Sequence, residues 1–176
     1  MKFAESTIPG AYVIDIEPVA DERGFFARTF CRTEFDREGL ETGFEQTSLS
    51  RNKRRGTLRG MHYQAEPHGE VKLVRCSRGR IHDVIVDLRS DSPAYCRWFG
   101  VELSEGSCRA LYIPRGVAHG FITLEDNAEV TYAISTAFRA ESARGVRWND
   151  PAFAIEWPTA PAVMSARDAG YENFRR

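Results

Sequence analysis

Short segments in which apolar and polar residues alternate, each ended by glycine, proline or charged residues, recur along this sequence. In residues 80–88, for example, Val84 and Val86 share one face while Asp83 and Ile85 share the other. Such alternation predicts β-strands, and many short strands at this spacing are typical of a β-sandwich or barrel. The predicted strands lie at residues 11–17, 24–30, 44–50, 57–63, 70–77, 80–88, 97–104, 109–114, 119–124 and 128–136.

Two segments interrupt the strand pattern. Residues 33–39 begin with Thr33 and end with Gly39, which predicts one short helix near the N-terminus. Residues 143–158 contain two tryptophans and show little periodicity. This stretch is too aromatic for a disordered segment, so we expect an ordered tail that packs on the strands. Such a tail can bring a late residue to a site built by earlier strands.

The composition fits a single domain that spans residues 1–176. Hydrophobic residues make up 42% of the chain, enough for a core and too many for a disordered protein. The 24 Lys and Arg residues balance 25 Asp and Glu residues, which disfavours a nucleic-acid or membrane partner because such binding needs a basic excess. No signal-peptide pattern, membrane-length apolar run or CxxC pair occurs, so we expect a cytoplasmic protein with reduced thiols.

His62 and Asp168 are candidates for acid–base chemistry. His62 lies in LRGMHYQ (58–64), and the unperturbed pKa of histidine, ~6.5, suits a general base. Asp168, in SARDAG, could hold the imidazole in one tautomer and raise its basicity. The alternatives are a structural histidine and a solvated tail aspartate.

Lys72 and Tyr132 are candidates for the stabilisation of charge and the donation of a proton. Lys72 alternates with apolar neighbours in EVKLVRC and could act as a fixed cation beside a substrate oxygen. Tyr132, in EVTYAIS, could act as a general acid if its phenol lies in a polar cavity. The alternatives are a lysine that faces solvent and an aromatic residue of the core.

Metal and phosphate motifs are not apparent in the sequence. A metal-binding cupin has an H-x-H pair followed closely by Glu, whereas Gln64 stands two residues after His62, and His82 lies some twenty positions away. A histidine-rich metal site therefore has no support in the spacing. GxGxxG and Walker A loops are also missing, so Arg23 and Arg59, each next to a glycine, are the candidates for phosphate binding.

Seven motif segments follow one another along the chain: DERGFF (21–26), LRGMHYQ (58–64), VKLVRC (71–76), HDVIVDLRSDSP (82–93), IPRGVAHGF (113–121), WNDPAFAIEWP (148–158) and SARD (165–168). Taken together, these segments resemble the dTDP-4-dehydrorhamnose 3,5-epimerase family along nearly the whole chain. The resemblance implies an all-β cupin jelly roll with a short N-terminal helix and an ordered tail, usually a homodimer. It implies an isomerase that epimerises a nucleotide-linked 4-keto-6-deoxy sugar at C3 and/or C5, without a cofactor or metal, in dTDP-rhamnose and polysaccharide biosynthesis.

The resemblance also implies a role for each candidate residue. His62 matches the base and Asp168 its assistant, Lys72 matches the cation near the 4-keto oxygen, and Tyr132 matches the acid. Removal of a proton next to the ketone would leave an enolate whose charge Lys72 stabilises. Positions that contact the diphosphate or the sugar match Arg23, Arg59, His119 and, more loosely, Arg167. Gln46 and Phe138 match positions near the nucleotide base. Arg28, Ser48 and Lys72 are also expected to bind the substrate.

Five positions depart from the family pattern. Arg28 and Ala143 stand where a Glu is usual, Thr47 and Ser48 stand where the family usually has Asp and Asn, and Glu70 stands near the place of a Gln. Thymine offers a ring N–H that needs an acceptor, and an arginine only donates. The sequence therefore leaves three alternatives open: an epimerase on a dTDP-sugar, a mono-epimerase on a CDP- or GDP-sugar, and a sugar-binding cupin without catalysis.

Overall fold

The computed structural model describes residues 1–175. It contains helices α1 (Arg32–Arg37) and α2 (Ala166–Ala169) and the 3-10 helix η1 (Glu105–Ser107). The strands are β1 (Lys2–Glu5), β2 (Tyr12–Asp15), β3 (Val19–Asp21), β4 (Gly24–Phe26), β5 (Gln46–Asn52), β6 (Leu58–Gln64), β7 (Lys72–Arg78), β8 (Arg80–Asp87), β9 (Trp98–Ser104), β10 (Arg109–Ile113), β11 (Val117–Thr123), β12 (Ala128–Ile134) and β13 (Ala143–Gly145).

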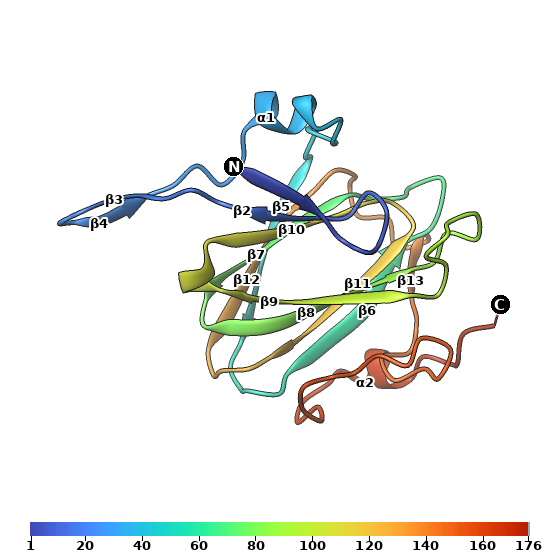
Figure 1. Ribbon diagram of the computed structural model, residues 1–176. Helices are drawn as coiled ribbons and strands as arrows, with labels where there is room; N and C mark the ends of the chain where they lie inside the picture. The colour runs from blue at the N-terminus through green and yellow to red at the C-terminus, as the bar shows by residue number, and fades with distance from the viewer. Residues whose placement is uncertain (176) are drawn as a thin grey trace.

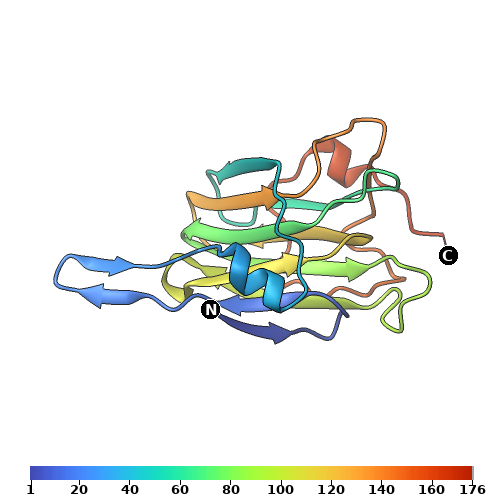
Figure 2. The same ribbon diagram turned by 90° about the horizontal axis from the view of Figure 1, so that it is seen from above.

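Two antiparallel sheets pack face to face (Figures 1 and 2). One has the order β1-β2-β10-β7-β12-β5, and the other has the order β13-β6-β11-β8-β9. The core between them joins Val74, Leu111 and Val130 of the first sheet to Ile85 and Phe121 of the second. Inward side chains of both sheets interdigitate in such a sandwich. The predicted all-β jelly-roll class is confirmed.

Helix α1 covers part of the outer face of the six-stranded sheet. Its Phe35 is fully buried and packs with Ile14, Leu73 and Tyr112. The helix lies within one or two residues of the predicted segment, and it ends before Gly39, whose φ of 70° ends the helical turn. Within the described residues, no helix is long and apolar enough to cross a membrane.

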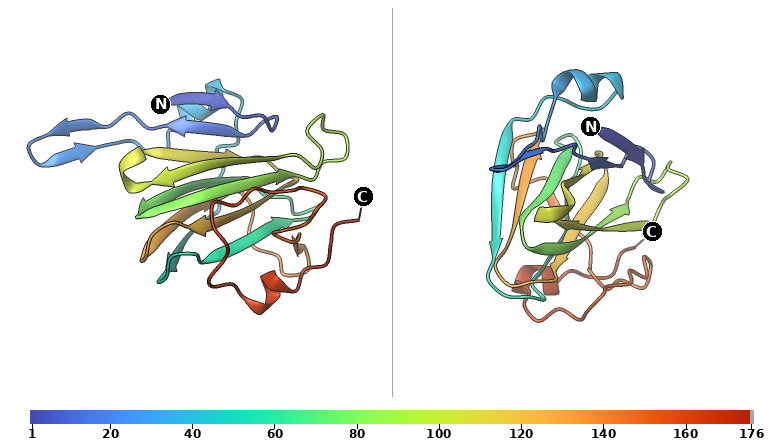
Figure 3. Two further views of the ribbon diagram at one scale, coloured as in Figure 1. Left: turned by 60° about the horizontal axis from the view of Figure 1, so that its bottom comes forward. Right: turned by 60° about the vertical axis from the view of Figure 1, so that its left-hand side comes forward.

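The C-terminal tail covers the outer face of the five-stranded sheet (Figure 3). Val146 and Phe153 of the tail pack on Met61, Val84 and Val86. The predicted ordered tail is therefore confirmed. It also explains why β8 is buried on both faces, although its alternation alone is typical of a strand with one solvated face.

Three short strands, β1, β3 and β13, are not predicted by the alternation. Each spans only three or four residues, too few for a period of two to stand out. The predicted strand 24–30 is cut short to β4, because β3 and β4 form a separate two-stranded hairpin.

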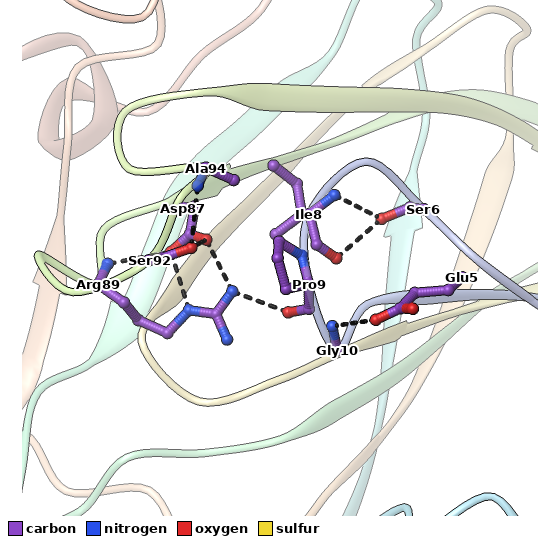
Figure 4. A network of polar contacts seen from close by, with 9 residues as sticks. All are labelled: Glu5, Ser6, Ile8, Pro9, Gly10, Asp87, Arg89, Ser92 and Ala94. Carbon is purple, nitrogen blue, oxygen red and sulfur yellow. Dashed lines mark hydrogen bonds and ion pairs between the residues drawn. The ribbon is translucent and has the colours of Figure 1, made fainter.

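An ion pair between a buried carboxylate and a partly exposed arginine ties the end of β8 to the N-terminal turn (Figure 4). Asp87 is fully buried and accepts hydrogen bonds from Arg89 Nε at 2.9 Å, Arg89 Nη2 at 2.7 Å and Ser92 Oγ at 2.6 Å. Arg89 Nη2 also donates to the carbonyl oxygen of Pro9 at 2.8 Å. Burial alone would raise the pKa of Asp87, but the hydrogen bonds from Arg89 and Ser92 outweigh it and lower the pKa.

Replacement of Arg89 by alanine should destabilise the fold by about 2–3 kcal/mol at neutral pH, because the buried Asp87 carboxylate loses its charged donor. A lowered carboxylate pKa contributes stability above the unfolded pKa, and that contribution disappears as the pH falls. The difference in unfolding free energy between the wild type and the variant should therefore narrow in acid. Urea unfolding at several pH values measures it.

Arg80→Ala is the matched control, since Arg80 is a surface arginine whose ion pairs with Glu102 and Glu125 are exposed. Its loss should cost less than about 1 kcal/mol. An equal cost for the two substitutions would contradict the role given to the Asp87–Arg89 pair.

Candidate active site

Strand β6 presents Arg59 and His62 on the same side, although residues three apart in a regular strand point to opposite faces. The pairing with β11 changes register here, so that His119 lies opposite His62 and Phe121 opposite Arg59. This irregularity re-aims side chains as a β-bulge does. Gly60 lies inside it at a φ of 134°, and a Cβ there would come within 2.5 Å of the β11 backbone, so only glycine fits.

The structure brings His62 and Asp168 together across 106 positions of sequence. Asp168 Oδ1 lies 2.8 Å from His62 Nε2, and Asp168 Oδ2 accepts the backbone N–H of Gly60 at 3.2 Å. The hydroxyl of Ser165 accepts the backbone N–H of Asp168 and begins α2. A carboxylate only accepts, so the shared proton sits on Nε2 and leaves Nδ1 as the basic nitrogen.

The surroundings of His62 favour its neutral form. Burial lowers its pKa below the ordinary value, and the charges of Lys72 and His119 act in the same direction. Asp168 raises the pKa through its hydrogen bond and charge, without outweighing burial. A neutral imidazole can accept a proton near neutral pH, so the geometry and the charge state both suit a base.

Lys72 is a buried cation beside His62. Its side chain is only 9% exposed, and Nζ lies 2.8 Å from Glu70 Oε1 and donates to the carbonyl oxygen of His62 at 3.2 Å. The alternative that Lys72 faces solvent is therefore wrong. An unpaired buried ammonium would be costly, so Glu70 explains how the charge is retained.

Tyr132 on β12 lies beside His119 of β11, with ring centroids 6.0 Å apart in an edge-on arrangement. His119 Nε2 lies 2.6 Å from Asp83 Oδ1, and both side chains are buried. Burial raises the pKa of Tyr132 far above its ordinary value, with Asp83 adding to the effect and Arg59 opposing it. The phenol of Tyr132 therefore stays protonated in the free protein.

His62, Lys72, His119 and Tyr132 line one cleft with two lobes. The inner lobe, of about 260 Å³, is lined by Ser48, Ser50, Arg59, His62, Lys72, His119, Phe121, Tyr132 and Ile134. The outer lobe, of about 360 Å³, shares Ser48, His62, Lys72 and Ile134 with it and adds Gln46, Phe138, Arg144 and Arg167, among others. Gln46 Oε1 accepts the backbone N–H of Phe138 at 2.9 Å, which joins the two residues that the sequence placed near the base.

Arg23 and Arg28 do not line this cleft. The β3–β4 hairpin, hereafter the arm, projects away from the sandwich (Figures 1 and 2). Arg23 stands at its turn, pairs with Asp21 and has a side chain that is 84% exposed. Arg28 follows the arm, is 64% exposed and lies 3.7 Å from Glu34. The expectation that both bind substrate is not met within one chain, because the arm leaves the body that holds the cleft.

Three acceptors in and around the cleft carry no role in the sequence prediction. Glu70 pairs with Lys72, Asp83 pairs with His119, and Asn52 Oδ1 accepts from Arg59 Nε at 2.8 Å. The sequence held a signal for two of them, Glu70 and Asp83. Residues 70 and 72 share a face of the predicted strand 70–77, and a buried acid such as Asp83 in an apolar strand needs a partner.

The histidines considered for a metal lie in different places. His62 lines the cleft, whereas His82 packs against Trp157 of the tail, with ring centroids 6.4 Å apart. In residues 1–175, no group of three or more His, Cys, Asp or Glu side chains is placed to hold a metal ion.

Comparison with known proteins identifies the family. The sequence model of dTDP-4-dehydrorhamnose 3,5-epimerase matches residues 5–176. The chain belongs to the dTDP-4-dehydrorhamnose 3,5-epimerase family. It is 38% identical to the dTDP-4-dehydrorhamnose 3,5-epimerase of Shigella flexneri, over 99% of this chain and 96% of that protein. It is 37% identical to the dTDP-4-dehydrorhamnose 3-epimerase of Streptomyces niveus, over 96% of this chain and 81% of that protein.

Solved structures agree with this family. The crystal structure of dTDP-4-dehydrorhamnose 3,5-epimerase from Bacillus anthracis, with TDP and PPi bound, aligns with a TM-score of 0.95 and 35% identity. The alignment covers 98% of this chain and 99% of that one. The predicted resemblance is confirmed, and membership in this epimerase family makes the chain an isomerase.

Replacement of Asp168 by asparagine should lower kcat about 10²–10⁴-fold, because an amide no longer fixes the imidazole tautomer. Asp168 raises the pKa of His62, so its loss should move the acidic limb of the kcat–pH profile to lower pH. Ser165→Ala is the control, since it removes the α2 cap and keeps the carboxylate. It should cost about 1 kcal/mol of stability and leave the limb in place. If the acidic limb of the kcat–pH profile stayed in place in Asp168→Asn, the effect of Asp168 on the pKa of His62 would be contradicted.

Proposed function

We propose that this chain inverts C3 and C5 of a dTDP-linked 4-keto-6-deoxy sugar by proton transfer through an enolate. One observation carries the proposal: a neutral imidazole, a buried ammonium and a protonated phenol line the same lobe. His62 comes from the five-stranded sheet, whereas Lys72 and Tyr132 come from the six-stranded sheet. A sugar ring between the sheets would meet the base and the acid on opposite faces.

His62 is the proposed base. The carbons next to a ketone are acidic because removal of their proton places charge on the carbonyl oxygen. His62 Nδ1 accepts that proton, and Asp168 stabilises the imidazolium that forms. The buried position of Asp168, 4% exposed, keeps this electrostatic support unscreened by water.

Lys72 is the proposed partner of the enolate oxygen. One well-placed donor in a dry site lowers such a barrier by ~3–4 kcal/mol. Lys72 is held in advance by Glu70 and by the His62 carbonyl, so it need not reorganise when charge develops. Tyr132 then returns a proton from the opposite face, which inverts the carbon.

The outer lobe is the proposed nucleotide and diphosphate site. Arg144 and Arg167 supply charge for phosphate, and Phe138 offers an exposed ring on which a base can stack. The Bacillus anthracis relative contains TDP, which supports dTDP as the nucleotide. The Streptomyces niveus relative is named a 3-epimerase, so inversion at C3 alone is the second candidate.

A homodimer would complete the site. The arm exposes Val19, Phe25 and Phe26, which are 73%, 59% and 77% exposed. Apolar residues gathered on a projecting hairpin mark an interaction surface. A hollow of about 900 Å³ on the outer face of the six-stranded sheet, lined in part by Phe44 and the exposed Leu49, offers a second apolar surface. We propose that the arm of one copy reaches the cleft of the other and delivers Arg23 there.

Turnover in D₂O with a dTDP-linked 4-keto-6-deoxy sugar should place two deuterons in the product, one for each inverted carbon. His62→Ala should abolish exchange and inversion. Tyr132→Phe should keep exchange while inversion falls by ~10²–10⁴, because abstraction does not need the acid. Mass spectrometry counts the deuterons.

One deuteron would establish inversion at a single carbon, and its position at C3 in the NMR spectrum of the product would establish the 3-epimerase alternative. Faster turnover of a CDP- or GDP-sugar would overturn the choice of nucleotide. Unchanged deuterium uptake by His62→Ala would refute the proposed base. Equal loss of exchange and inversion in Tyr132→Phe would make Tyr132 structural.

Mixing two inactive variants tests the shared site. If the arm acts on the partner's cleft, a heterodimer of His62→Ala and Arg23→Ala has one site with both lesions and one intact site. Activity should therefore rise well above that of either variant after the subunits are exchanged. A cleft served by its own arm would leave one lesion in every site and no recovery. Sedimentation velocity reports whether the mixed species is a dimer.

A further inference from the structure

Gly145 leaves the flank of the His62 imidazole open. In the β6–β13 pair Gly145 lies directly opposite His62. Side chains at opposed positions of an antiparallel pair share one face and contact each other. At this position there is no side chain to cover the ring.

Tyr171 of the C-terminal tail fills that space. Its ring lies edge-on to His62, with centroids 6.3 Å apart. A Cβ built on Gly145 would come within 2.1 Å of Tyr171 Cζ and 2.5 Å of its hydroxyl oxygen. The tyrosine therefore rests directly on the glycine, and no larger residue at 145 would leave it there.

The hydroxyl of Tyr171 has a second contact. It accepts a hydrogen bond from Arg167 Nε at 3.0 Å, and Arg167 lines the outer lobe of the cleft. The same short tail segment carries Asp168, the partner of His62. Tyr171 thus contacts His62 through its ring and Arg167, at the rim of the cleft, through its hydroxyl.

We propose that Tyr171 is a positioning residue of the epimerase reaction, which covers the His62 ring at Gly145 and holds Arg167 at the rim of the cleft. This inference rests on the proposed function for its effect on turnover. The ring shields His62 from water and restricts its orientation. The hydroxyl keeps Arg167 extended toward a phosphate of the bound nucleotide.

Several charged or titratable groups face His62. Substitution of Tyr171 removes one of the side chains that bury the imidazole and leaves the other groups unchanged. Asp168 of α2 raises its pKa, Lys72 of β7 and His119 of β11 lower it, and burial lowers it most. Tyr132 of β12 and Arg59 of β6 line the same lobe, and Glu70 and Arg144 line the outer lobe with His62. Removal of the Tyr171 ring leaves these groups in place and admits water, so the pKa of His62 should rise toward its ordinary value.

Three variants of the full chain separate the two contacts. Tyr171→Phe keeps the ring and should raise KM several-fold at unchanged kcat. Tyr171→Ala should lower kcat about ten- to hundredfold, as a loosened catalytic group does, and move the acidic limb of the kcat–pH profile upward. Gly145→Ala should reproduce the effect of Tyr171→Ala, because the methyl group displaces the ring.

A double-mutant cycle and a matched control complete the design. Gly145→Ala combined with Tyr171→Ala should be no worse than either single variant, because both act through one contact. Phe174→Ala truncates another tail aromatic, which packs on Phe153 and Tyr95, and should leave the pH limb unmoved.

NMR titration of the His62 ring needs no substrate and separates this inference from the proposed function. An upward shift of the His62 pKa in both Tyr171→Ala and Gly145→Ala would support the contact even if the wild type turned over no dTDP-sugar. Unchanged titration and kcat in Tyr171→Ala, or additive losses in the double variant, would overturn it. Absence of deuterium exchange by the wild type would instead refute the proposed reaction.

Discussion

The packing of the C-terminal tail on the five-stranded sheet is the interaction on which the active site depends. Burial of Val146 and Phe153 against Met61 and Val84 holds the tail in place. That apolar contact brings Asp168 to the edge of β6, where it meets a histidine 106 positions away. Apolar burial at ~25 cal/mol per Å² supplies the free energy for such a long-range contact, which loop closure opposes.

A second constraint is the cost of charge inside a sandwich. Three ionisable groups of the cleft are each paired with a carboxylate: His62 with Asp168, Lys72 with Glu70, and His119 with Asp83. Each pair satisfies a group that would otherwise be desolvated without compensation. The pairing also prepares the site, since the charges that a reaction through an enolate requires are already oriented before substrate arrives.

The irregular register of β6 also prepares the site, because it brings polar side chains into one cleft. A regular strand cannot direct both Arg59 and His62 into one cleft, and the register shift against β11 makes it possible. The arm is the opposite case, because it leaves the sandwich and exposes its aromatic residues. The register shift in β6 gathers residues within one chain, whereas the arm, in our proposal, carries Arg23 to a second copy.

The sequence by itself determined the longer strands, the short helix, the ordered tail and the family, because alternation and motif segments are local properties of the chain. It also singled out His62, Asp168, Lys72 and Tyr132 as candidates. Only the tertiary structure decided which groups meet: that Asp168 pairs with His62, that Glu70 accompanies Lys72, and that Arg23 lies far from the cleft of its own chain. Alternation shows which face a residue occupies, but not which distant segment packs against that face. That choice follows from burial and register in the folded chain as a whole.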